Sequence, residues 1–281
     1  MDEKTLCERD LLAYEQHLLR EERTPATVEK YLRDVRSFAD WLDDGPVTRE
    51  AAALWKDALL AKGLSPATVN AKLSALNGLF RFLDWKDCRV KFLKLQRRAF
   101  RDASRDLSRD DYQRLLAAAQ GGGRECLALL LEAICATGVR VSEVRFITVG
   151  AAERGRADVT LKGKIRTILL PGKLCRKLLK YAKKQKIASG EIFLTKGGDS
   201  LSRKQIWREM KSLCAKAGVA PSKVFPHNLR HLFAATFYRA THDIVKLADV
   251  LGHSSINTTR IYLMTTGAEH ARQLERLGLV S

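Results

Sequence analysis

The last third of the chain contains the stretch LGHSSINTTRIY, residues 251–262. Gly252 is typical of a residue that ends a helix in a left-handed cap, which would leave His253 as the first residue outside that helix. Either of the two serines that follow can cap a second helix, which would carry Tyr262 two turns from its start. The stretch therefore predicts two helices joined by a sharp turn, with a histidine at the turn and a tyrosine beyond it.

Two other polar motifs lie earlier in the chain. Arg140 and Glu143 stand three residues apart in ATGVRVSE, where a glycine can end the apolar helix predicted over 127–136. His227 and Arg230 have the same spacing in PHNLRH, where a proline marks the first turn of a helix. Taken singly, each pair is more typical of a surface ion pair, or of a capping histidine beside a solvated arginine, than of a functional site.

Together, the polar residues of these motifs indicate chemistry on a DNA phosphodiester. Two guanidinium groups can hold the non-bridging oxygens of a phosphate, and two imidazoles can move or orient protons near neutral pH. A tyrosine hydroxyl can act as the covalent nucleophile. Lys162 in LKGKIR is a plausible sixth member. The other five are Arg140, His227, Arg230, His253 and Tyr262.

Composition also favours a nucleic-acid partner. The 281 residues carry a formal net charge of +18, with a sequence pI near 9.8, and such an excess attracts polyanions. A merely basic protein and an anionic membrane surface are the alternatives. No apolar stretch approaches the roughly 20 residues that a membrane-spanning helix needs, and the start MDEKTLCERD lacks a signal-peptide pattern. We therefore expect a cytoplasmic protein with no membrane partner.

Neither a metal nor a cofactor is expected. His227 and His231 stand four apart, as helical zinc ligands can, but Arg230 between them would oppose a bound cation. No nucleotide-binding P-loop occurs. The six cysteines are widely scattered and predict reduced thiols rather than a disulfide framework: Cys7, Cys88, Cys126, Cys135, Cys175 and Cys214.

The N-terminal hundred residues contain a short internal repeat, TPATV at 24–28 and SPATV at 65–69. In each copy a Ser or Thr can cap a helix while proline occupies its first turn. With partner helices predicted over 6–19 and 49–60, the pattern indicates a four-helix domain. A plain bundle fits equally well, but the basic side chains favour DNA binding, among them Arg33, Arg36, Lys72 and Arg81.

A basic stretch over 86–109, with nine Lys or Arg and three Asp, predicts an interdomain connection. The predicted division is a helical DNA-binding domain over 1–98, a basic linker over 99–106 and a second domain over 107–281. That second domain is expected to be mainly helical with one β-hairpin around Lys162-Gly163-Lys164, followed by a basic amphipathic helix over 172–186.

The four motifs R-x-S-E, H-x-L-R-H, L-G-H-S-S and T-x-x-Y resemble the catalytic boxes of the tyrosine recombinases, the phage-integrase family. The intervals of 23 residues from Arg230 to His253 and nine from His253 to Tyr262 are similar to those of compact bacterial members of the Xer type. The resemblance implies a mainly α fold: a SAM-like helical core-binding domain, then a catalytic domain with a small β-sheet.

The resemblance implies a metal-independent site-specific recombinase that acts through a 3′-phosphotyrosyl intermediate and a Holliday junction. Tyr262 would attack the scissile phosphate. Arg140 and Arg230 would stabilise charge on the phosphoryl oxygens, with a further hydrogen bond from His253. The implied partners are double-stranded DNA recombination sites and three more copies of the chain in a homotetramer, or a related recombinase.

The remaining implied roles concern His227, Glu143 and Lys162. His227 would be the general base or would orient the tyrosine, and Glu143 would support the pocket. Lys162 would protonate the departing 5′-oxygen, although the family's hairpin usually reads G-K-G and Leu161 stands in the first position here. Lys164 is therefore the competing candidate.

Two other functions and one structural question stay open at this level. The same chemistry would serve a type IB topoisomerase, and the same fold could serve a non-catalytic DNA-binding protein. Residues 268–280 are predicted to form a short amphipathic segment after Gly267, which can break the preceding helix. That segment could dock on its own domain or on a neighbouring protomer.

Overall fold

The structure is a computed structural model that describes residues 4–95, 103–161, 164–263, 271–272 and 275–277. The chain divides into two compact units, residues 1–97 and 98–281. The predicted linker over 99–106 lies partly outside the described residues, so the predicted domain limits stay a prediction. Within the described ranges, no helix is both long and apolar enough to cross a membrane.

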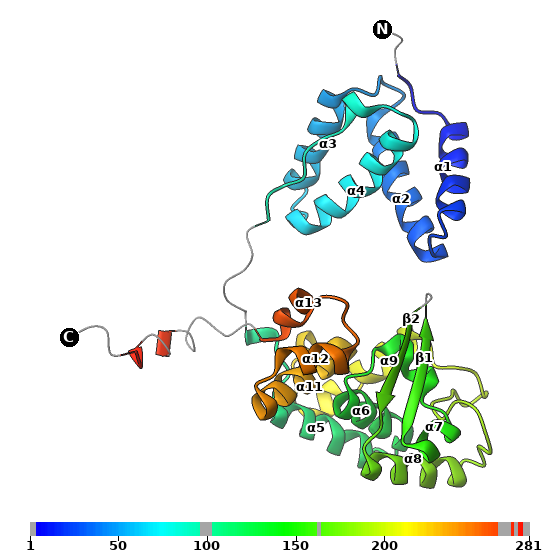
Figure 1. The fold of residues 1–281 in the computed structure, drawn as a ribbon, viewed down its shortest axis with the longest axis vertical. Coiled ribbons are helices and arrows are strands. Elements are labelled where there is room, and N and C mark those ends of the chain that lie inside the picture. Colours follow the sequence, from blue (N-terminus) through cyan, green and yellow to red (C-terminus); the bar gives the residue numbers. More distant parts are fainter. Residues whose placement is uncertain (1–3, 96–102, 162–163, 264–270, 273–274, 278–281) are drawn as a thin grey trace. The chain divides into compact units, whose positions relative to one another are not determined.

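Among its described residues, the first unit has four α-helices and a short 3₁₀ helix, coloured blue to cyan in Figure 1. They are α1 (Glu8–Arg20), α2 (Pro25–Leu42), α3 (Arg49–Ala61), α4 (Pro66–Phe82) and η1 (Lys86–Cys88). Both copies of the repeat begin a helix at their proline, as predicted. Ser65 accepts a hydrogen bond from the Thr68 amide, but Thr24 makes no such capping bond and faces the Thr27 hydroxyl at 2.9 Å instead.

Two asparagines of α4 hold the chain that leaves this unit. The Asn77 side chain donates to the Val90 carbonyl at 2.9 Å and accepts from the Val90 amide at 3.1 Å. Asn70 makes the same pair of bonds with Leu93, at 2.9 and 2.8 Å. Each amide thus replaces the strand partner that an extended backbone would otherwise need. The basic stretch predicted as linker from residue 86 therefore still belongs to the first unit as far as Leu93.

The second unit is mainly helical, and its one sheet among the described residues is a two-stranded antiparallel hairpin. The bounds of its elements are η2 (Ala103–Arg105), α5 (Arg109–Gln120), α6 (Glu125–Thr137), η3 (Val141–Phe146), α7 (Val149–Arg154), β1 (Arg156–Leu161), β2 (Lys164–Leu169), α8 (Gly172–Lys184), α9 (Arg203–Lys211), α10 (Cys214–Ala217), η4 (Pro221–Lys223), α11 (Pro226–Thr241), α12 (Ile244–Leu251), α13 (Ile256–Arg260) and η5 (Ile261–Leu263).

Helix α6 is the centre of this unit, because it is apolar on nearly every side and packs against α5, α8 and α11. In Figure 1 it lies between the hairpin and the helices α11 and α12. The hairpin pairs Arg156 with Leu169 and Leu161 with Lys164. Its inward face buries Val159 and Ile168, which is the alternation expected for a strand with one covered face. The predicted mainly α fold with a small sheet is confirmed.

Two glycines end helices where no other residue would fit. Gly138 follows α6 and Gly252 follows α12, and both have a φ of +63°, in the left-handed region. A Cβ on Gly138 would collide with the Phe233 ring, and a Cβ on Gly252 would collide with the Arg166 side chain. These two turns therefore bring backbone carbonyls close to side chains from distant parts of the chain.

The tail after the tyrosine can be described only in part. Gly267, Leu274 and Val280 lie outside the described residues, whereas Ala271 and Leu277 are exposed. Whether the segment docks on its own domain or on a neighbour stays a prediction.

Candidate active site

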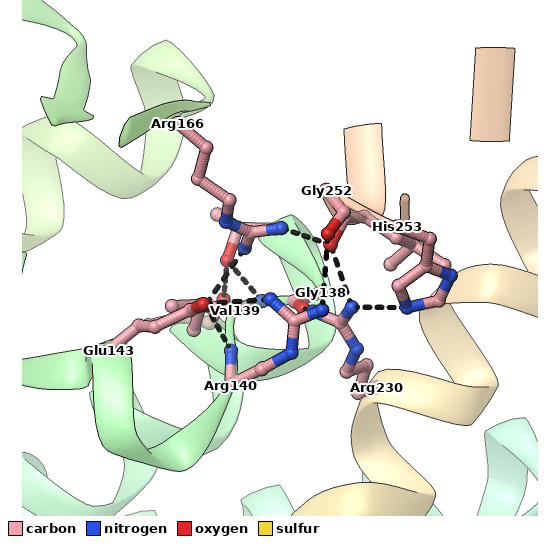
Figure 2. A network of polar contacts seen from close by, with 11 residues as sticks. Gly138, Val139, Arg140, Glu143, Arg166, Arg230, Gly252 and His253 are labelled. Carbon is pink, nitrogen blue, oxygen red and sulfur yellow. Dashed lines mark hydrogen bonds and ion pairs between the residues drawn. The ribbon is translucent and has the colours of Figure 1, made fainter. Parts of the chain in front are cut away.

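The predicted motifs converge on one pocket of the second unit. Figure 2 shows three arginines, from the loop before η3, from β2 and from α11, pointing at the same backbone turn after α12. The turn carries Gly252 and His253. Two of the arginines, Arg140 and Arg230, were predicted from the sequence, and the third, Arg166, was not.

Arg140 and Glu143 form a closed local unit. The Arg140 amide donates to Glu143 Oε2 at 2.9 Å, and Arg140 Nη1 donates to Glu143 Oε1 at 2.8 Å. A carboxylate at the third position of a helical turn is suited to receive both bonds. Arg140 Nη2 reaches the Gly252 carbonyl at 3.3 Å, and the side chain stays 38% exposed. Arg140 is thus oriented by protein groups yet open on one side.

Arg230 is buried and is held by backbone carbonyls. Its Nη1 donates to the Gly138 carbonyl, and its Nη2 donates to the Leu251 carbonyl at 2.8 Å and contacts His253 Nε2 at 2.9 Å. The last carbonyls of a helix lack partners within the helix and carry partial negative charge. Burial and the charge of Arg140 lower the pKa of Arg230, while a hydrogen bond with Tyr262 opposes that change.

His253 is held from both of its ring nitrogens. Nε2 faces a guanidinium N–H, so it must accept, and this assigns the proton to Nδ1, which lies 2.8 Å from the Thr259 hydroxyl. Thr259 is fully buried. Burial, and next the charge of Arg230, lower the pKa of His253 to about 4. The imidazole is therefore neutral at physiological pH, with a fixed tautomer.

Tyr262 is buried among histidine rings. Its ring centroid lies 5.8 Å from that of His253, with the two planes 11° apart, and 5.5 and 5.2 Å from those of His227 and His231. It belongs to η5 rather than to the second turn of a helix, because α13 ends at Arg260. The tyrosine and the arginines of a single protomer therefore lie together in one site.

The structure leaves one predicted group untested and adds two. Lys162 lies outside the described residues, and Lys164 is described only by its backbone pairing with Leu161. Thr259 and Arg166 belong to the pocket but were missed. Arg166 shares the inward face of β2 with buried Ile168, and a charged residue in that alternating pattern was the available signal. Among the described residues, no three metal-ligating side chains cluster together.

Comparisons with known proteins agree with this geometry. The model of the phage integrase family matches residues 105–269, and that of the N-terminal SAM-like domain of phage integrases matches residues 11–87. The chain is 29% identical over 292 residues to tyrosine recombinase XerA of Pyrococcus furiosus, with 100% of this chain and 98% of the relative covered. It is 32% identical over 268 residues to tyrosine recombinase XerD of Caulobacter vibrioides, covering 86% and 85%.

Two solved structures have a similar fold. A lambda integrase fragment, crystallised as a dimer bound to a COC′ core site, gives a TM-score of 0.75 at 20% identity, covering 94% of this chain and 97% of that one. XerH bound to its difH substrate gives 0.69 at 20% identity, covering 95% and 84%. Since one family model spans more than half of the sequence and includes the whole pocket, the chain belongs to the phage integrase family and is an Xer-like tyrosine recombinase.

Proposed function

We propose that Tyr262 is the nucleophile with which this recombinase cleaves DNA, and that Arg140 and Arg230 hold the scissile phosphate. The observation that carries the proposal is the position of the Tyr262 ring, buried and stacked beside His253, whose Nε2 contacts Arg230 at 2.9 Å. A tyrosine in this setting attacks a phosphate that the arginines already orient.

The two arginines are suited to different parts of the phosphate. Arg140 is open to solvent on one side, so it can take a phosphoryl oxygen with its fork of N–H groups. Arg230 is buried, so its attraction to a phosphate is screened less by water than that of an exposed arginine would be. Both supply positive charge where negative charge develops in the transition state, which is the role that a metal ion has in other phosphoryl transferases.

The histidines and a lysine would manage the protons. The Tyr262 oxygen forms a bond to phosphorus, its proton passes to His227, and the bond from phosphorus to the 5′-oxygen breaks. Lys162, or Lys164 in its place, protonates the leaving 5′-oxygen. His253 accepts a hydrogen bond from Arg230 through Nε2 and so orients that guanidinium beside the phosphate. Reversal of these steps by a new 5′-hydroxyl reseals the strand.

The proposed substrate is a pair of short duplex sites, joined through a Holliday junction by four copies of the chain in the cytoplasm. Support comes from the net charge of +18 and from relatives of the same fold, XerH crystallised with a difH substrate and lambda integrase as a tetramer on a Holliday junction. A related recombinase could supply some of the four subunits.

The test of the nucleophile is Tyr262→Phe on a nicked suicide duplex. We expect normal DNA binding and no covalent adduct on a denaturing gel, because only the attacking oxygen is lost. Tyr238→Phe, a tyrosine of α11, is the matched control and should cleave normally. An adduct formed by Tyr262→Phe would refute the assignment. A protein that binds but never forms an adduct would be the non-catalytic alternative, and one that relaxes supercoils without recombining sites would be a topoisomerase.

The general acid can be tested separately with a 5′-bridging phosphorothiolate, whose sulfur leaves without protonation. Lys162→Ala should be inactive on normal DNA and active on this substrate. Rescue of Lys164→Ala instead would transfer the role to Lys164.

A further inference from the structure

Arg166 connects three elements of the pocket. It stands on β2, its Nη2 donates to Glu143 Oε2 at 2.9 Å, and its Nη1 donates to the Leu251 carbonyl at the end of α12. Its side chain passes directly over Gly252, where a Cβ would not fit. Figure 2 shows the guanidinium between the Glu143 side and the turn that carries His253.

The burial of Arg166 is costly. Its side chain is only 15% exposed, and its Nε is buried with no hydrogen-bond partner among the described residues. A buried donor without a partner destabilises a fold by roughly 1–3 kcal/mol. Burial also lowers the pKa of Arg166 to about 10. Its two terminal nitrogens hold Glu143 and the Leu251 carbonyl, so the contacts of Arg166 suit it to keep these two groups in place.

The bond from Arg166 to Glu143 determines which carboxylate oxygen the Arg140 side chain can use. A carboxylate with two free oxygens prefers to take an arginine side-on, through two parallel bonds. Here Oε2 is occupied by Arg166 and by the Arg140 amide, so the Arg140 side chain bonds Oε1 alone. Arg140 Nη2 reaches the Gly252 carbonyl at 3.3 Å, and the side chain stays 38% exposed, so part of its guanidinium edge is open to a phosphate.

We propose that Arg166 is a positioning residue: its guanidinium holds the Glu143 carboxylate so that Arg140 keeps an open edge for the DNA phosphate. The same guanidinium fixes the Leu251 carbonyl, which Arg230 also uses. Arg166 thereby ties the hairpin to both phosphate-binding arginines. The inference rests on the proposed roles of Arg140 and Arg230.

The experiment measures DNA affinity and the single-turnover cleavage rate at saturating suicide substrate. In Arg166→Met we expect unchanged affinity and a cleavage rate lower by on the order of 100-fold, since small displacements of a catalytic group can have effects of that size. Arg156→Met, on the exposed face of β1, removes the same charge from the same hairpin and should cleave normally.

Arg166→Lys serves as the second variant, because Met could prevent folding. A lysine keeps the charge but lacks the fork that reaches two acceptors at once, so it should fold with a normal melting curve and recover only part of the rate. A wild-type cleavage rate in folded Arg166→Lys would overturn the proposal.

A double-mutant cycle tests whether Arg166 acts through Glu143. If it does, Arg166→Lys combined with Glu143→Gln should cleave no more slowly than the slower single variant, because both remove the same arrangement. Effects that multiply would overturn the proposal. Arg140→Ala separates this outcome from a failure of the proposed function: a wild-type rate there would refute the phosphate contact itself.

Discussion

Each of the two units contains a buried carboxylate that bridges two cations, and the two bridges have different surroundings. In the first unit Asp34 bonds Lys30 at 2.7 Å and Lys72 at 3.1 Å. In the second unit Glu143 bonds Arg140 at 2.8 Å and Arg166 at 2.9 Å. Both carboxylates are 5% exposed.

The difference lies in what surrounds the cations. The lysines of the first unit reach solvent, and Lys72 also lies over the Trp55 ring, so the cluster needs no further partner. In the second unit a third cation, Arg230, is buried nearby and is bonded to backbone carbonyls and His253. This cluster therefore contains three guanidinium groups, of which only Arg140 and Arg166 are bonded to the carboxylate. The lysines of the first cluster are satisfied by their carboxylate and by solvent, whereas we propose that the arginine cluster retains positive charge that can bind a phosphate.

The largest expected effect comes from exchanging arginine and lysine in the two clusters. Arg230→Lys should reduce the cleavage rate by roughly 100- to 1,000-fold, because a single ammonium cannot replace the fork in the transition state. Lys72→Arg should change the free energy of unfolding by less than about 1 kcal/mol, because Lys72 still reaches solvent and either cation can bond the Asp34 carboxylate. Single-turnover cleavage and denaturant unfolding measure the two effects. A wild-type cleavage rate in Arg230→Lys would mean that the arginine cluster tolerates exchange as the lysine cluster does.

The second test neutralises each carboxylate in turn. Asp34→Asn and Glu143→Gln should both reduce the free energy of unfolding, by roughly 3 kcal/mol at most, since the cations that lose their partner can still reach water in part. Only Glu143→Gln should also slow cleavage at saturating DNA. Equal cleavage rates in the two folded variants would show that the arginine cluster is structural like its counterpart.

These clusters also show what the sequence could predict. Arg140 with Glu143, and Gly252 with His253, are neighbours in the chain, so their spacing predicted how they meet. The partners of Arg166 lie 23 and 85 residues away. No local period encodes such contacts, and they exist only once the hairpin folds against α12.

The position of Tyr262 was predicted better than its local structure. A helix start was expected two turns earlier, yet Tyr262 lies in a 3₁₀ turn. Thr259, in α13, bonds His253, while Tyr262, in η5, stacks on the same ring. These contacts with His253 are tertiary, and no local sequence pattern encodes them, so the α-helical period did not predict the local structure at Tyr262.

A smaller effect on stability is expected where buried polar groups all have hydrogen-bond partners. Asn77→Ala should reduce the free energy of unfolding of the first unit by roughly 2 kcal/mol, because the buried Val90 amide and carbonyl both lose their partner. Asn70→Ala should cost less, since its bonds to Leu93 are only partly buried. Denaturant unfolding of the full chain, followed through the tryptophans of this unit, measures both. An equal loss in the two variants would mean that burial does not set the cost.

The smallest expected effect is the pH dependence contributed by His253. Burial, and next the charges of Arg230, Arg140 and Arg166, hold the pKa of His253 at about 4, below the ordinary value of 6.5, while Glu143 opposes them. The neutral ring therefore contributes its full stability above pH 6.5. As the pH falls from 6.5 toward 4, the unfolded chain takes up a proton that the folded chain does not, and stability declines. Because the ring is partly accessible, screening should limit this contribution to about 1 kcal/mol.

The stability difference between the wild type and His253→Gln, followed from pH 8 to pH 4, isolates this contribution from the titrating carboxylates. This difference should shrink as the solution becomes more acidic, and a difference that stays constant would mean that neither burial nor the arginines lower the pKa of the imidazole.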